Sequence, residues 1–416
     1  MQDILTKSYN FIMSRPRIFN KHNRQLVISV FIFIGLVLAT ILVVLYGKGY
    51  RFGFEPTGFE VKGTGLLVAK SIPDGAQVFV DGKLRTATDA TINLPPGDYN
   101  IRIEKEGYFP WQKKLRIQAE IVTLAEALLI PIAPKLESIT ELGAINPVID
   151  PSLTKIAFTV SSGSATRNGI YVFDMGSNRI LTLQGSSTQI VDDSFDEFSR
   201  SEISWSPDGQ DIIATISASL TSTTYLLDTD RPNQPPADVT NSLQAISQSW
   251  QSLALARERS IRNALPKKVR TLADENFEIL SITPDENKIL YTASRSASLP
   301  FVIEPRLIAV NSTPEERSIQ EGSVYVYDVL EDRNYKMDGQ NFENANTWMN
   351  NSRHILFVRD NALHIVDFDG LNDTVIYAGP FEHQYIFPWP DSSRIVILTN
   401  LGNQRTLPNL YTIILK

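Results

Sequence analysis

The chain has 416 residues, of which 43% are hydrophobic and 20% are charged, and its formal net charge is −7. It contains no cysteine and four histidines, which excludes disulfide bonds, thiolate metal sites, a cysteine nucleophile and a lipid-modified cysteine, and leaves little for a histidine metal cluster. A chain of this length is expected to form two or three folded units.

The first element in chain order is an apolar run, Leu26 to Tyr46, that contains no charged residue. As a helix rising ~1.5 Å per residue it would span about 31 Å, which matches the hydrocarbon core of a membrane. A cleaved signal peptide is the alternative, but it would have a shorter run and a cleavage site between small residues, whereas Tyr46 is followed by Gly-Lys-Gly-Tyr. We therefore expect an uncleaved transmembrane signal anchor over residues 26–46.

Basic residues are more numerous before this run than after it. Five Lys and Arg residues lie within residues 1–25, and three lie within residues 47–65. The positive-inside rule therefore predicts a cytoplasmic basic tail over 1–25, a juxtamembrane linker over 47–65 and extracytoplasmic domains after it. The expected localisation is the cell membrane, crossed once, with the N-terminus in the cytoplasm.

Residues 66–131 alternate strand signals with turn signals. Asp81-Gly82 suits a tight hairpin because glycine tolerates positive φ, and Pro95–Asp98 marks a second turn. Residues 99–104 alternate apolar and polar side chains, as a half-buried antiparallel strand does. The pattern predicts a compact all-β module.

This module resembles the PEGA domain. The resemblance is carried by Pro73–Ala76, Val78–Gly82, Leu94–Tyr99, Lys105–Tyr108 and Trp111, with Asp74 where the four-letter name has Glu. PEGA domains occur in surface and envelope proteins and have no known catalytic chemistry, so the resemblance implies a spacer or binding module. Tyr99, Tyr108 and Trp111 are expected to pack in its core rather than to form an exposed platform for sugars.

The rest of the chain is built from a degenerate repeat. Each copy has an apolar strand after a Pro/Asp turn, and these strands contain Ile156, Ile212, Ile289, Ile355 and Ile395. The last copy lacks residues for a fourth strand, and a strand within 135–140 is available to supply it. This arrangement predicts about five four-stranded blades closed into a ring, although the longest gap between copies has room for a sixth.

The copy at Trp205–Gly209 (WSPDG) resembles the TolB-like and WD-type propeller repeats, and the resemblance spans about 135–416. It implies a β-propeller. The expected fold class is therefore an all-β ectodomain, made of a small PEGA-like β-sandwich and a β-propeller of about five blades, on one N-terminal transmembrane helix.

Two insertions interrupt the repeat. Near 237–265, five apolar residues recur at spacings of three and four, which places them on one face of a helix: Val239, Leu243, Ile246, Trp250 and Leu253. This helix either docks on the rim of the propeller itself or exposes the face to a partner, with Trp250 as the anchor. The second insertion, near 296–322, has three prolines and few strand signals, and it predicts a long loop.

The search for chemical motifs yields no catalytic, cofactor-binding or metal-binding residue. The acidic groups within 192–197 and 367–373 are expected to be solvated turns rather than calcium sites. Gly47-Lys48-Gly49 is expected to be a hinge, since no strand precedes it and no helix pattern follows it. Residues 132–416 carry a net charge of −12, which argues against a nucleic-acid partner.

The expected function is non-catalytic binding or scaffolding in the cell envelope, with an envelope protein or a cell-wall glycan as the partner and no cofactor. Propellers usually bind across the face of the disc or in the central channel. The alternative is a glycan-acting enzyme with two carboxylates in that channel, because glycoside hydrolysis needs such a pair at about 5–10 Å.

Overall fold

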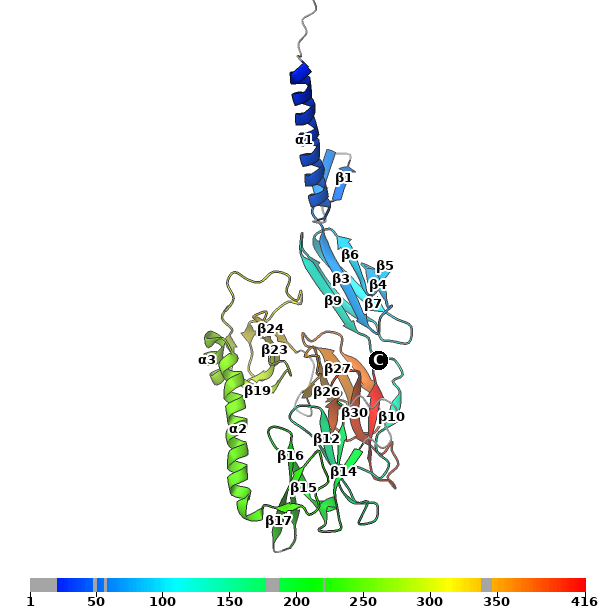
Figure 1. The fold of residues 1–416 in the computed structure, drawn as a ribbon, viewed down its shortest axis with the longest axis vertical. Coiled ribbons are helices and arrows are strands. Elements are labelled where there is room, and N and C mark those ends of the chain that lie inside the picture. The colour runs from blue at the N-terminus through cyan, green and yellow to red at the C-terminus, as the bar shows by residue number, and fades with distance from the viewer. Residues whose placement is uncertain (1–20, 48–50, 56–57, 177–186, 220, 338–345) are drawn as a thin grey trace, which may run out of the picture.

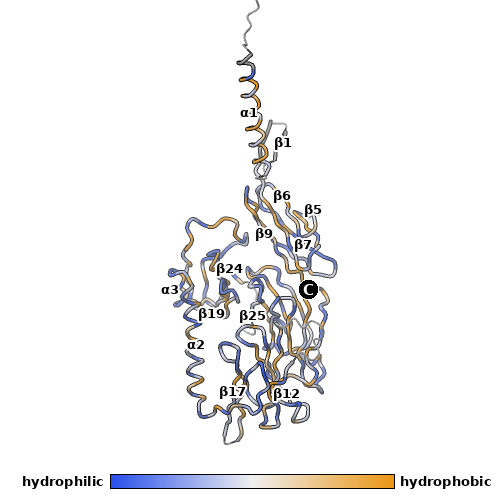
Figure 2. Tube along the Cα trace, in the orientation of Figure 1, coloured by the Kyte–Doolittle hydropathy of each residue, from blue (hydrophilic) through white to orange (hydrophobic). Residues whose placement is uncertain are grey.

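The computed structural model describes residues 21–47, 51–55, 58–176, 187–219, 221–337 and 346–416. Most of the expected cytoplasmic tail, residues 1–20, therefore lies outside the described residues. The first element is helix α1, Lys21–Gly47, which projects from the rest of the molecule (Figure 1). Within it, the segment Gln25–Gly47 has a mean hydropathy of 3.1, and none of it is buried against the rest of the molecule (Figure 2). Its length and composition suit a membrane span or a signal sequence.

The segment expected to be the juxtamembrane linker, 47–65, contains a hairpin, and most of the expected hinge, Gly47–Gly49, lies outside the described residues. Strands β1, Arg51–Glu55, and β2, Gly58–Lys62, pair antiparallel, with Phe52 opposite Val61 and Phe54 opposite Phe59. The aromatic and β-branched residues of these two segments favour strands.

The next seven strands form a two-sheet sandwich, as expected from the sequence. They are β3 Gly65–Ile72, β4 Gln77–Val80, β5 Lys83–Ala87, β6 Ala90–Leu94, β7 Gly97–Glu104, β8 Trp111–Ile117 and β9 Val122–Leu128. One sheet has the order β6-β3-β9, with β3 and β9 parallel, and the other has the order β5-β4-β7-β8. Asp81 and Gly82, with φ of 48° and 77°, form the two-residue turn between β4 and β5. Trp111 is buried in the sandwich core, and Tyr99 and Tyr108 pack against it.

Five four-stranded antiparallel sheets follow, which confirms the expected propeller. Blade 1 is β11 Ile145–Ile149, β12 Lys155–Val160, β13 Gly169–Asp174 and β14 Ser187–Asp192, and blade 2 is β15 Glu202–Trp205, β16 Asp211–Ser217, β17 Ser222–Asp228 and β18 Ala237–Asp238. Blade 3 is β19 Phe277–Ile282, β20 Lys288–Ala293, β23 Val324–Asp328 and β24 Arg333–Lys336, and blade 4 is β25 Asn346–Trp348, β26 His354–Arg359, β27 Ala362–Asp367 and β28 Thr374–Tyr377. Blade 5 is β29 Ile386–Pro388, β30 Arg394–Thr399 and β31 Asn409–Ile414, completed by β10, Leu136–Ser138.

Strand β10 closes the ring in the predicted way. Although it precedes blade 1 in the chain, it pairs antiparallel with β31, and Leu136 lies opposite Ile413. This pairing covers the edge of β31 and gives the last blade its fourth strand. The first blade and the last blade also share a hydrophobic core that includes Phe158 and Leu398.

Packing between blades is continuous except between blades 2 and 3. Buried clusters join blade 1 to blade 2, blade 3 to blade 4 and blade 4 to blade 5, and in the described part of the chain none combines strands of blades 2 and 3. The remaining face of blade 3 is covered by Leu265 and by α3, Lys267–Asn276, through Val269 and Ala273. Helix α2, Leu243–Ala264, runs along the side of the ring and leads into α3 (Figure 1).

The longest gap between repeat copies therefore holds two helices where a sixth blade was considered. Helix α3 is not predicted by the sequence, because the predicted helical insertion ends near residue 265 and Pro266 follows it. Pro266 is instead the residue that caps the start of α3, and proline suits the first turn of a helix because the N–H that it lacks would be unpaired there.

Candidate functional site

The sandwich meets the propeller along strand β8, and we call this contact the joint. The indole Nε1 of Trp111 donates a 3.1 Å hydrogen bond to Oδ2 of Asp367, the last residue of β27 in blade 4. The backbone N–H of Gln112 donates to Oδ1 of Asn372 at 2.9 Å. The two acceptors lie at the end of β27 and in the turn that follows it, so this part of blade 4 contacts the edge of the sandwich.

The insertion of blade 3 takes part in the joint as well. Its Ser312 accepts a 2.9 Å hydrogen bond at Oγ from the backbone N–H of Arg116. Its neighbour Asn311 donates from Nδ2 to Oδ2 of Asp369 at 2.7 Å, and Lys113 forms an ion pair with the same carboxylate. The Asp369 side chain has no exposed surface, so this charge is compensated by groups from the sandwich and from blade 3.

Asp367 is held in its charged form by its surroundings. Burial alone would raise its pKa, but a hydrogen bond from His354 together with the nearby charges of His354 and Lys113 holds the pKa below the usual value. His354 Nε2 lies 3.2 Å from Oδ1 of Asp367. The expectation that residues 367–373 form a solvated turn was therefore wrong, because Asp367 and Asp369 are buried and serve as acceptors in the joint.

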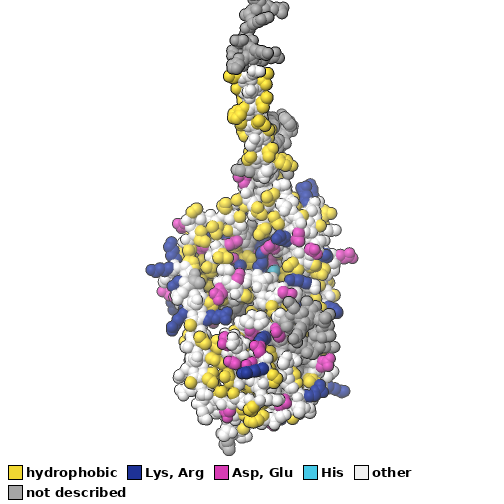
Figure 3. Space-filling model, viewed as in Figure 1, with side chains coloured by type: hydrophobic (Ala, Val, Ile, Leu, Met, Phe, Trp, Pro, Cys, Tyr) yellow, Lys and Arg dark blue, Asp and Glu magenta, His cyan; other side chains and the backbone are white. Residues whose placement is uncertain are grey.

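A groove of about 230 Å³ opens beside the joint, and we call it the joint groove. One wall is β9, where Val122 and Leu124 are 47% and 53% exposed. The opposite wall is the blade 3 insertion at 309–312, and His354, Asp367 and Phe368 also line the groove. Acidic, basic and histidine side chains gather between the sandwich and the propeller on the face shown in Figure 3.

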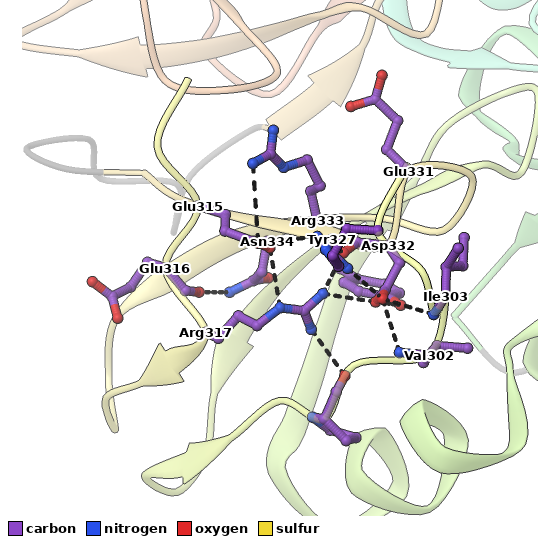
Figure 4. A network of polar contacts seen from close by, with 12 residues as sticks. Val302, Ile303, Glu315, Glu316, Arg317, Tyr327, Glu331, Asp332, Arg333 and Asn334 are labelled. Carbon is purple, nitrogen blue, oxygen red and sulfur yellow. Dashed lines mark hydrogen bonds and ion pairs between the residues drawn. The ribbon is translucent and has the colours of Figure 1, made fainter. Parts of the chain in front are cut away.

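A buried polar network fixes the insertion that forms this wall (Figure 4). Oδ2 of Asp332 accepts hydrogen bonds from the backbone N–H groups of Val302 and Ile303, at 2.8 and 3.1 Å, and from Arg306 at 2.7 Å. Oδ1 accepts from the hydroxyl of Tyr327 at 3.0 Å. The segment expected to be a long loop is thus held at several points, and a small sheet of β21, Ala297–Ser298, and β22, Ser318–Ile319, closes its base.

Two carboxyl groups of this region respond differently to burial. Burial would raise the pKa of Asp332, but hydrogen bonds from Arg317, Val302 and Ile303 hold it below the usual value. Burial raises the pKa of Glu331, although this side chain accepts a 3.0 Å hydrogen bond from the backbone N–H of Asn311. Glu331 also lines the joint groove, and it precedes Asp332 in the chain, so the groove and the network are adjacent.

The predicted binding face lies mostly on α2. Leu243, Ile246 and Trp250 are half-buried, Leu253 is 52% exposed, and Val239 precedes the short helix η2, Thr240–Ser242, that leads into α2. None of the described side chains of α2 is buried. The joint is separate from this face, so the structure does not bring the two candidate regions together.

Other acidic residues have clear local roles. In the turn 192–197, Asp193 accepts a hydrogen bond from the Ser199 hydroxyl at 2.6 Å, and Asp196 accepts one from the Tyr225 hydroxyl at 2.9 Å.

The first strand of each blade is its inner strand. Within the described residues these inner strands carry two acids, Glu202 and Glu278; the strands are β11, β15, β19, β25 and β29.

Sequence reasoning missed the joint because its partners are far apart in the chain. One local signal was present, since Lys113 lies on the same core-facing side of β8 as Trp111 and Leu115. A lysine at an inward-facing strand position requires a buried partner, and this signal was available from the period-two pattern alone. Nothing in the sequence near Lys113 identifies that partner as Asp369, which lies 256 residues away in the chain.

Comparison with known protein families identifies the sandwich. Residues 64–129 match the PEGA domain. No curated protein matches the chain.

Several solved structures show similarity to the chain at low identity. TolB from Acinetobacter baumannii is 15% identical with a TM-score of 0.22, over 76% of this chain and 59% of that one. A putative TolB from Agrobacterium tumefaciens is 14% identical with a TM-score of 0.21, over 64% and 77%. The β-propeller domain of the Trilobed protease from Pyrococcus furiosus is 13% identical with a TM-score of 0.21, over 85% and 96%.

The chain thus spans 59% of the length of the first of these structures. The propeller assignment rests on the five four-stranded sheets and on their closure by β10. The protein therefore combines a PEGA domain with a β-propeller and an N-terminal apolar helix.

Proposed function

We propose that this protein is a non-catalytic scaffold of the cell envelope, which is anchored by α1, presents its propeller outside the membrane and binds a partner protein through α2. The apolar length of α1 supports the anchor, and the excess of Lys and Arg in residues 1–25 supports the orientation. The PEGA domain, which separates α1 from the propeller, is the spacer in this arrangement.

The observation that carries the proposal is the exposure of α2. A helix on the surface of a globular protein normally turns an apolar stripe toward its own core. Helix α2 has such a stripe, yet none of its described side chains is buried, and Leu253 is 52% exposed at its centre. This helix is 22 residues long, and within the described residues none of its side chains belongs to a buried core cluster of the propeller.

The chemistry of this face favours a protein over a glycan. Amphipathic helices bind grooves through apolar residues at spacings of three and four, and tryptophan is enriched among the residues that dominate binding energy. Leu243, Ile246, Trp250 and Leu253 follow this pattern. Tyr99, Tyr108 and Trp111, the aromatic residues considered as a platform for sugars in the PEGA domain, pack in or against its core, and Trp111 also bonds to the propeller.

The acids that the structure places in polar networks support a non-catalytic role. Asp332, Asp367 and Asp369 are buried and accept hydrogen bonds from other groups of the chain. A glycan-acting enzyme would instead need two carboxylates at about 5–10 Å from each other that face its substrate.

A photo-crosslinking amino acid at position 253 of the full chain, expressed in its own cells, tests the proposal. We expect one dominant crosslinked protein, and we expect Trp250→Ala in the same chain to weaken its binding about 30-fold, since central interface tryptophans contribute ~2 kcal/mol or more. Position 248 is the matched control, because Gln248 is exposed on the opposite side of α2. Equal crosslinking from positions 253 and 248, or no crosslinked protein, would contradict the proposal.

A further inference from the structure

The PEGA domain brings two strand edges to the joint, and only one of them is covered. Strand β8 is the edge of its sheet, and its backbone N–H groups at Gln112 and Arg116 are bonded by Asn372 and Ser312 of the propeller. Strand β9 is the edge of the other sheet, and its paired neighbour is β3.

The hydrogen bonds at the two ends of β9 show which of its backbone groups point toward β3 and which point away from it. Ile121 accepts a hydrogen bond from Leu66 through its carbonyl, and the N–H of Leu129 donates to Ile72, so odd-numbered residues direct their backbone groups toward β3. Because these directions alternate along a strand, the N–H and C=O groups of Val122, Leu124 and Glu126 point away from β3. Within the described ranges, none of these outward groups forms a hydrogen bond.

The side chains along this edge are apolar and exposed. Val122 lies in register with Leu66, and Leu124 lies in register with Val68, so four apolar side chains share the outer face of the sheet. Proteins normally protect such an edge with charge, proline or a covering segment, because it is a template for pairing with another chain. Here the edge is left open beside the joint groove.

The walls of the groove suit an extended strand. Val122, Leu124 and Glu126, at alternate positions of β9, all line it. The wall that faces β9, residues 309–312, belongs to the insertion that the Asp332 network fixes in place. Because these walls are already positioned, the protein itself loses little conformational entropy when a segment binds between them.

The groove also continues an interface that the protein already uses. Glu126 of β9 forms an ion pair with Arg353 of the propeller, and both residues line the groove. The propeller therefore bonds to β8 and contacts the far end of β9, while the middle of β9 stays open.

We propose that the edge of β9 binds an extended peptide segment of a partner protein, which adds to the sheet as a further strand within the joint groove. The outward N–H and C=O groups of Val122, Leu124 and Glu126 bond to the backbone of this segment. Its apolar side chains, at alternate positions, pack against Val122 and Leu124. This site is separate from the α2 face and does not depend on it.

A library of random twelve-residue peptides displayed on phage, selected against the full chain in lipid nanodiscs, tests this proposal. We expect enriched peptides with alternating apolar residues, and we expect Leu124→Lys to weaken their binding more than tenfold. Leu84→Lys is the matched control, since Leu84 is 58% exposed on β5 at the edge of the other sheet. Trp250→Ala should leave peptide binding unchanged.

A second measurement does not depend on any variant folding. N-methylation of alternate amides in an enriched peptide removes its strand hydrogen bonds but keeps its side chains, so it should abolish binding in one of the two alternation registers. The bound peptide should also slow hydrogen exchange at Leu124 and Glu126. Equal binding by the N-methylated peptides, no enriched peptide, or a self-association of the chain that Leu124→Lys removes would each overturn the proposal.

Discussion

Asp332 shows how one buried carboxylate organises a segment that has few strand signals. Its side chain has no exposed surface, and it receives hydrogen bonds from two backbone N–H groups, Tyr327 and Arg306, and an ion pair from Arg317 at 2.9 Å. Removing one partner of a buried ion pair costs more than the pair itself contributes, because the other charges remain buried without compensation.

Asp332→Asn should therefore lower the free energy of unfolding by about 3–5 kcal/mol, as measured by urea denaturation of the full chain in detergent. The control is Asp230→Asn, because Asp230 pairs with Lys155 at 2.8 Å but its side chain is 79% exposed, and such surface pairs contribute about 1 kcal/mol or less. Similar effects of the two substitutions would show that the network does not stabilise the fold.

At the scale of elements, the joint is a contact between pieces that are distant in the chain. The alternation of β8 and the turn residues of the PEGA domain are local signals, and they were sufficient to predict the sandwich. The turn between β27 and β28 was interpreted as solvated, since nothing near it in the sequence reveals Trp111 and Lys113 as its partners. The spacing of Leu243, Ile246 and Trp250 was a sufficient signal for α2, whereas Pro266 concealed α3 because a proline is compatible with the end of one helix and the start of the next.

The joint should open in acid before the blades unfold. The pKa of Asp367 is lower in the folded chain than its usual value of 3.8, so folding favours the ionised form. Its stabilisation is complete above pH ~5 and is lost as the pH falls through the folded pKa, because the protonated carboxyl no longer attracts His354 and Lys113. Small-angle scattering should show the radius of gyration of the full chain in detergent increasing below pH ~4.

The matched variant for this pH dependence is Asp367→Asn, which keeps the size of the side chain but carries no charge. We expect the joint of this variant to be looser at neutral pH and the acid step to be smaller. An acid step of unchanged size in Asp367→Asn would assign the transition to other carboxylates.

At the scale of the whole molecule, the fold is a propeller of five sheets with a helical insertion between blades 2 and 3. The repeat predicted the five sheets, and the missing fourth strand of the last copy predicted closure by β10. The absence of a shared core between blades 2 and 3, within the described residues, could not be read from the apolar strands, because those of all five copies look alike; the long insertion between the two copies was the one local signal. The face of blade 3 that shares no core with blade 2 is covered by α3. Helix α2 is exposed on the side of the ring (Figure 1).

The central claim is that the propeller and α2 lie outside the membrane while the tail lies in the cytoplasm. The chain has no cysteine, so a single introduced cysteine reports its own location without interference. Ser247→Cys, on the exposed surface of α2, and Ser8→Cys, in the basic tail, are the two positions to compare in intact cells with a membrane-impermeant maleimide. We predict labelling of position 247 in intact cells and labelling of position 8 only after permeabilisation; the reverse pattern would contradict the account.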